Sequence, residues 1–144
     1  MNIVFLDIDG VLNNFSLIQR HGFDYIDSSM VIRLGRIIDR TGAEIVLSSY
    51  WRLDPKDRSV VDHSLGEHGM SVMDVTPRLS GPRANEIRQW LGENRDVVRY
   101  AILDDDDEAG IGMEHSFFQT DPEVGITAEI ANSSILHLNG GEND

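Results

Sequence analysis

Asp7 and Asp9 stand two residues apart at the end of an apolar run, within residues 5–11. In extended backbone this spacing projects both side chains to the same side. Neighbouring carboxylates repel each other unless a cation lies between them, and oxygen ligands with no cysteine or histidine nearby favour Mg²⁺. Gly10 allows the chain to turn sharply and to approach a ligand closely. An isolated pair of this kind is more often a solvent-exposed turn, so its meaning depends on its surroundings.

A second acidic group follows another apolar run. Asp104 and Asp105 come directly after residues 100–103, at the end of a predicted strand. The acids of residues 106–108 continue the run, and acidic runs on loops are usually solvated charge. We therefore expect the first two acids to join the pair at Asp7 in one metal site, and the last three to be loop charge.

Hydroxyl groups and a cation occupy further positions of the same kind. Ser48 and Ser49 follow the predicted strand at residues 43–47, which ends in three apolar residues. Arg83 lies in the first turn of a predicted helix, where a cation opposes the helix dipole unless it points at an anion. Arginine can bind two phosphate oxygens at once. A strand-ending hydroxyl and a surface cation are the ordinary alternatives, but beside the acids these residues predict a phosphate site.

The neighbouring pair Trp51 and Arg52 allows two interpretations. An aromatic ring beside a cation can stack on a nucleobase. A tryptophan directly after a strand more commonly covers the edge of the core. We favour the second interpretation. The five histidines are scattered without a metal-ligand spacing, and none is assigned a role.

Alternating strands and helices are predicted to position these groups. Strands are expected at residues 2–6, 43–47, 71–75, 98–103 and 116–119, and helices at about residues 30–41, 57–65, 82–92 and 128–138. This alternation predicts one three-layer α/β/α, Rossmann-like domain with a mostly parallel sheet covered on both faces. Ligands bind beyond the carboxyl ends of such strands. The polar groups above would therefore meet at one rim of the sheet.

Length and composition limit the function classes. A chain of 144 residues favours a single domain, which we place at residues 1–139 with a flexible tail at 140–144. The absence of cysteine excludes disulfides and thiolate sites. A net charge of −13 argues against an extensive nucleic-acid-binding surface, although a single terminal phosphate can still bind. The first apolar run is too short for a membrane span and lacks the features of a signal peptide, so we expect a cytoplasmic protein without a membrane partner.

Taken in the order of the sequence, the four groups resemble the motifs of the haloacid dehalogenase (HAD) superfamily of phosphohydrolases. The acids at Asp7 and Asp9 match the first motif, Ser48 the second, Arg83 the third, and the pair beginning at Asp104 the fourth. The residues around them are similar to a small branch found in RNA-repair proteins and phages, and to phosphatase domains of polynucleotide kinase-phosphatases. Two departures stand out. The third motif usually has lysine, and residues 11–27 leave no room for a cap domain.

The resemblance implies a Mg²⁺-dependent phosphomonoesterase. Asp7 would attack phosphorus and form an aspartyl-phosphate, and Asp9 would protonate the leaving oxygen and later activate water. The metal would be held by Asp7, by the backbone carbonyl of Asp9, and by Asp104 or Asp105. The phosphate oxygens would be bound by Ser48, Ser49 and Arg83. The substrate would be a nucleotide or the terminal 3′-phosphate of a nucleic acid, or another phosphorylated small molecule.

Two other functions compete with this one. A receiver-type phosphoaccepting signalling module shares the sheet and the magnesium, but its lysine and its phosphoacceptor aspartate have no clear counterparts in this sequence. A catalytically inactive HAD-fold binding protein is the second alternative. Such a protein is expected to have lost one of the acids, and none is missing here.

Overall fold

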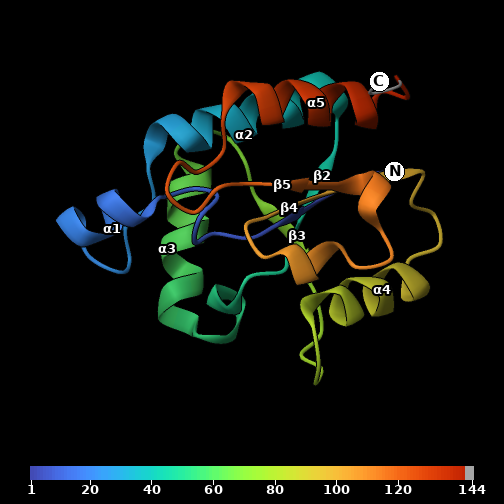
Figure 1. The fold of residues 1–144 in the computed structure, drawn as a ribbon, viewed down its shortest axis with the longest axis horizontal. Helices are drawn as coiled ribbons and strands as arrows, with labels where there is room; N and C mark the ends of the chain where they lie inside the picture. Colours follow the sequence, from blue (N-terminus) through green and yellow to red (C-terminus); the bar gives the residue numbers. More distant parts are fainter. Residues whose placement is uncertain (142–144) are drawn as a thin grey trace.

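The computed structural model describes residues 1–141, which form a five-stranded, all-parallel sheet with strand order β3-β2-β1-β4-β5 (Figure 1). The strands are β1 (Asn2–Leu6), β2 (Glu44–Leu47), β3 (Val72–Val75), β4 (Arg99–Asp104) and β5 (Phe117–Gln119). The strand order reverses between β1 and β4, which is where open α/β sheets bind ligands. Receiver-type domains have the order 2-1-3-4-5, so the topology argues against the receiver alternative.

Five α-helices accompany the sheet in residues 1–141. They are α1 (Phe15–His21), α2 (Ser28–Thr41), α3 (Pro55–Gly66), α4 (Arg83–Glu93) and α5 (Ala128–Leu138). The two helices α2 and α5 lie side by side on one face of the sheet, and α4 lies on the other (Figure 1). This arrangement confirms the predicted three-layer α/β/α domain.

The central strand β1 shows why both faces of the sheet need helices. Alternate side chains of a strand point to opposite faces. Val4 and Leu6 join the larger core cluster with residues of α2, α3 and α5, whereas Ile3 and Phe5 join the smaller cluster with α4. All four side chains are fully buried. A continuous apolar run is therefore the correct signature of a strand buried on both sides.

Most predicted elements are confirmed to within two residues. The caps of α2 show why this helix begins and ends where it does. Asp27 accepts a hydrogen bond from the backbone N–H of Met30 at the start of α2, and Gly42 ends this helix in the left-handed conformation. The helix α1 was not predicted. It lies between β1 and α2 and has seven residues, so this segment holds no cap domain, in agreement with the expectation.

The predicted C-terminal tail begins as an ordered helix cap. The backbone N–H groups of Gly140 and Gly141 donate to the carbonyls of His137 and Leu136 at the end of α5. The remainder, residues 142–144, lies outside the described residues, so the boundary of the domain at residue 139 stays a prediction. Among the helices in residues 1–141, none combines the length and the apolar character needed to cross a membrane.

Candidate active site

Three carboxylates meet at the carboxyl ends of the adjacent strands β1 and β4. The backbone N–H of Asp7 donates to the carbonyl of Leu103 at 3.0 Å, which aligns the two strand ends. Oxygen atoms of Asp7, Asp104 and Asp105 lie within 4.8 Å of one another. Asp7 and Asp104 are buried, with exposed fractions of 4% and 0%, and Asp105 is partly buried. The sheet therefore brings the predicted metal-binding acids together, except for Asp9.

Arg83 connects two of these acids. It is the first residue of α4, and its Nη1 lies 3.1 Å from Oδ1 of Asp7 and 2.7 Å from Oδ2 of Asp104. Its guanidinium also lies 5.0 Å from the ring centroid of Tyr50. Burial disfavours the charged guanidinium, but the two carboxylates outweigh this effect and raise the pKa of Arg83. Arg83 thus stays charged, at the position expected for the phosphate-binding cation.

The site holds more negative than positive charge. Burial raises the pKa of Asp7 well above its ordinary value; the nearby Asp104 raises it further, and Arg83 offsets only part of this effect. Burial also raises the pKa of Asp105. Three carboxylates against one guanidinium leave a site that favours an additional cation. Because all the donors are oxygen atoms, the residues fit Mg²⁺.

Gly10 leaves space for the third acid. Its φ of 79° lies in the left-handed region, and a Cβ atom at this position would overlap the carboxylate of Asp105. The carbonyl of Gly10 accepts a hydrogen bond of 2.7 Å from Oγ1 of Thr120, and its N–H donates to Oδ1 of Asn13 at 2.8 Å. The turn after β1 is therefore fixed by Asn13 within it and by Thr120, which follows β5.

Asp9 lies apart from the carboxylate cluster and is exposed. Its Oδ1 accepts a hydrogen bond from Nδ2 of Asn13 at 3.0 Å, and its Oδ2 accepts one from Nε1 of Trp51 at 3.1 Å. Neutral donors thus orient both oxygens of this carboxylate. The side chain of Asp9 therefore lies outside the group of acids that could hold a metal ion, and metal binding through its backbone carbonyl stays a prediction.

The two serines after β2 have different environments. The hydroxyl of Ser48 is buried and has no hydrogen-bond partner among the described residues. Leaving a buried hydroxyl unpaired costs free energy, so such a group commonly marks a ligand site. The hydroxyl of Ser49 accepts a hydrogen bond of 3.2 Å from the N–H of Trp51 and caps the 3₁₀ helix η1 (Tyr50–Leu53). The geometry favours Ser48 over Ser49 as a phosphate ligand.

Arg52 binds groups of the fold rather than a ligand. Its guanidinium makes five hydrogen bonds, to the carbonyls of Ser48, Ser49, Thr76 and Pro77 and to the carboxylate of Glu86. A guanidinium has five N–H donors, so none remains for a substrate. The ion pair with Glu86 is 2.9 Å long, and both side chains are buried. Arg52 therefore joins the ends of β2 and β3 to α4.

The sequence patterns missed several of these contacts. Trp51 is 6% exposed, which confirms that its ring covers the core edge, but its hydrogen bond to Asp9 was not predicted. Asn13 and Thr120 were also missed. Asn13 lies four residues after Asp9 in the same turn, and this short polar spacing is the one signal in the sequence that pointed to such a contact.

Comparison with known proteins agrees with this geometry. The family model described as the HAD domain in Swiss Army Knife RNA repair proteins matches residues 3–131, which include every residue of the site described above. No significant match to a curated protein or to a solved structure accompanies it. The match supports phosphohydrolase chemistry of the HAD type in general. The chain belongs to the family of HAD domains found in Swiss Army Knife RNA repair proteins.

Proposed function

We propose that this protein is a Mg²⁺-dependent phosphomonoester hydrolase that acts through an aspartyl-phosphate on Asp7. The substrate we propose is a nucleotide or the terminal 3′-phosphate of a nucleic acid. The observation that carries the proposal is the cluster of Asp7, Asp104 and Asp105 around the single guanidinium of Arg83.

In the first step, a carboxylate oxygen of Asp7 attacks phosphorus and the bond from phosphorus to the leaving oxygen breaks. Asp9 gives its proton to that leaving oxygen. In the second step, Asp9 takes a proton from water, and the resulting hydroxide attacks the phosphorus of the aspartyl-phosphate. This releases inorganic phosphate and restores the carboxylate of Asp7. The hydrogen bonds from Asn13 and Trp51 support the assignment of Asp9, because they fix its carboxylate for both transfers.

Arg83 and Ser48 bind the phosphoryl oxygens in this proposal. In the described part of the chain, hydrogen bonds and ion pairs of Arg83 involve Nη1 alone, so Nε and Nη2 remain available to an anion. The hydroxyl of Ser48 has no other partner among the described residues. The carboxylates of Asp7, Asp104 and Asp105, with the backbone carbonyl of Asp9, would hold Mg²⁺, which supplies positive charge to the phosphoryl group.

Hydrolysis of a generic aryl phosphate, of nucleoside monophosphates and of a 3′-phosphorylated oligonucleotide tests the activity. Chelation should abolish turnover, and Mg²⁺ should restore it. Full turnover after exhaustive chelation would contradict the metal dependence, and turnover of no phosphoester at all would favour the inactive binding protein.

Two variants test the nucleophile. Asp7→Asn should lower kcat by about 10⁴-fold or more, which is the usual cost of removing a nucleophile. The matched control is Asp107→Asn, which removes an exposed acid in the segment after β4. Asp9→Asn should slow the second step, so that mass spectrometry after an acid quench detects a phosphoryl group on the peptide containing Asp7. A phosphoryl group on another residue would refute the assignment.

A further inference from the structure

A cavity of about 320 Å³ opens beside Asp9. Its lining residues are Asp9, Phe23, Asp24, Tyr50, Trp51 and Asp57. Two segments form its walls: the turn between α1 and α2, and the stretch from η1 into the first turn of α3. These segments follow the adjacent strands β1 and β2. In the proposed reaction Asp9 protonates the leaving oxygen, so this cavity is where the leaving group lies.

Two of the lining residues are aromatic side chains left in solvent. Phe23 is 89% exposed and Tyr50 is 69% exposed. Large exposed aromatic rings beside a reactive group are typical of ligand-binding surfaces rather than of a folded core. The ring of Tyr50 also contacts the guanidinium of Arg83, so it lies between the proposed phosphate site and the cavity. Flat rings at this point favour a planar ligand.

The charges of the cavity argue against leaving groups that carry further phosphates. Three carboxylates and no cation line it. A second phosphate would be repelled, which argues against diphosphates or polyphosphates whose remaining phosphates enter the cavity. Carboxylates accept hydrogen bonds and donate none when ionised, so they match the N–H groups of a nucleobase.

We propose that this cavity binds the nucleoside part of the substrate, with the base stacked against Phe23 and Tyr50. The inference rests on the proposed function, because that function places the leaving oxygen at Asp9. It specifies the substrate as a nucleoside phosphate or a terminal nucleotide, in which the planar base rather than the phosphate alone provides selectivity.

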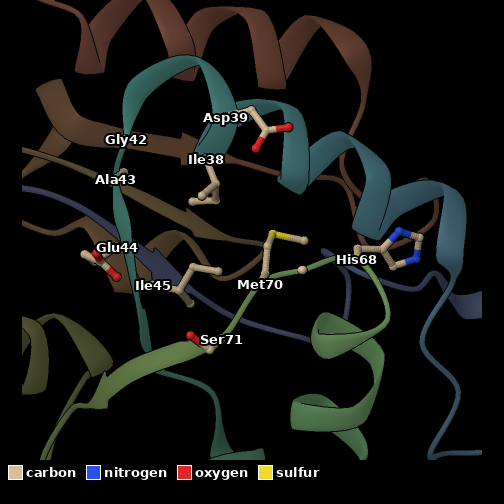
Figure 2. A pocket seen from close by; sticks show the side chains of 10 residues that line it. Ile38, Asp39, Gly42, Ala43, Glu44, Ile45, His68, Met70 and Ser71 are labelled. Atoms are coloured by element: carbon tan, nitrogen blue, oxygen red, sulfur yellow. The ribbon is translucent and has the colours of Figure 1, made fainter.

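A second cavity provides a contrast. It lies at the opposite, amino-terminal edge of the sheet, between the end of α2, the start of β2 and residues 68–71 (Figure 2). Its labelled side chains include Ile38, Ile45 and Met70. None of its ten lining residues is Phe, Tyr or Trp. The combination of exposed aromatic rings with a reactive carboxylate therefore distinguishes the cavity at Asp9.

Kinetic selectivity tests the inference. The ratio of kcat/KM for guanosine 3′-monophosphate to kcat/KM for glycerol 2-phosphate should be high in the wild type. Phe23→Ala should lower this ratio by about 10-fold, the usual effect of losing one base-stacking ring. The matched control is Phe15→Ala, which removes another exposed phenylalanine, 60% exposed and outside the cavity; its ratio should equal that of the wild type. A ratio that is near one in the wild type, or unaltered in Phe23→Ala, would overturn the inference while the phosphatase activity stands.

A binding measurement separates this inference from the proposed function. Unphosphorylated guanosine should quench the tryptophan fluorescence of the Asp7→Asn protein, because Trp51 lines the cavity. Adding Phe23→Ala to Asp7→Asn should weaken this binding by about 10-fold, and adding Phe15→Ala should not. Absence of guanosine binding would refute the nucleoside site. If the wild type turned over no phosphoester while the Asp7→Asn protein still bound guanosine, the proposed function alone would be refuted.

Discussion

Arg52 and Arg83 lie near the same rim of the sheet, yet their partners differ in kind. Arg52 is bound by four backbone carbonyls and one carboxylate, all of which hold the fold together. Arg83 is bound by Asp7 and Asp104, which belong to the candidate site. The backbone carbonyls cannot leave Arg52 without unfolding the loops that carry them. In the proposed reaction, the carboxylates around Arg83 would also bind a metal ion, and the unused N–H groups of Arg83 would bind the phosphate.

The comparison shows that burial and charge alone do not identify a substrate-binding cation. Both guanidiniums lie among buried groups. In the sequence, the two arginines are distinguished only because Arg83 begins a predicted helix. The number of unused N–H donors separates them. Arg52 has none left to bind a phosphate, whereas Arg83 retains Nε and Nη2.

The largest expected effect is a loss of stability on replacing Arg52. Arg52→Met should lower the free energy of unfolding by about 3–5 kcal/mol, because it leaves the buried carboxylate of Glu86 without its partner. Urea denaturation measures this change. The double variant Arg52→Met with Glu86→Gln should recover part of the loss, since the neutral amide can still accept from the N–H of Leu79. A loss below about 1 kcal/mol in the single variant would show that Arg52 contributes little to the stability of the fold.

The catalytic side of the comparison depends on Arg83. Arg83→Ala, assayed with saturating Mg²⁺, should lower kcat/KM by about 10²–10³-fold, the usual effect of removing one group that stabilises transition-state charge. Arg83→Lys should retain partial activity, because it keeps the charge but loses the forked geometry. The matched controls are Arg88→Ala and Arg95→Ala, both at exposed positions, and these should stay near the wild-type rate. Equal activity of Arg83→Ala and its controls would show that Arg83 does not bind the phosphate.

A smaller effect is expected one residue before Arg52. Trp51→Phe keeps a ring in the core but removes the N–H that donates to Asp9. We expect kcat to fall by about 10-fold, the approximate worth of a hydrogen bond to a charged group, with a shifted pH profile and little change in KM. Trp90→Phe is the matched control, because it removes a similar bond of 2.8 Å to Asp74. Equal effects of the two variants on kcat would show that Trp51 acts through stability alone.

The smallest effect concerns how the stability of the metal-free protein depends on pH. This dependence comes from the charges around Arg83. Because the folded protein raises the pKa of Asp7 above the ordinary value of 3.8, it binds this proton more tightly than the unfolded chain does. The resulting stability is fully present below the ordinary pKa and is lost as the pH rises through the raised pKa. Thermal unfolding of the chelated protein should therefore show lower stability near neutral pH than in mild acid.

Two comparisons isolate the contribution of Asp7. The Asp7→Asn protein should lack this part of the pH dependence, since its side chain does not titrate. Mg²⁺ should stabilise the wild type most near neutral pH, where the carboxylates are ionised. Identical pH dependence in the wild type and in Asp7→Asn would contradict the assignment of a raised pKa to this group.

The sequence by itself determined the elements and the order of the polar groups. Apolar runs and caps such as Asp27 and Gly42 are local features, and they predict strands and helices because backbone geometry depends on near neighbours. Parallel strands expose their carboxyl ends at one rim. The meeting of Asp7, Asp104 and Arg83 therefore followed from the predicted topology alone.

Only the tertiary structure decided how these groups are held. The hydrogen bond from Trp51 to Asp9 spans 42 residues, the pair of Arg52 with Glu86 spans 34, and the bond from Thr120 to Gly10 spans 110. Such contacts depend on which loop folds over which strand end, and no local pattern contains that information. For the same reason the sequence could not tell which serine keeps an unpaired hydroxyl, nor that Tyr50 rather than Trp51 presents its ring to solvent.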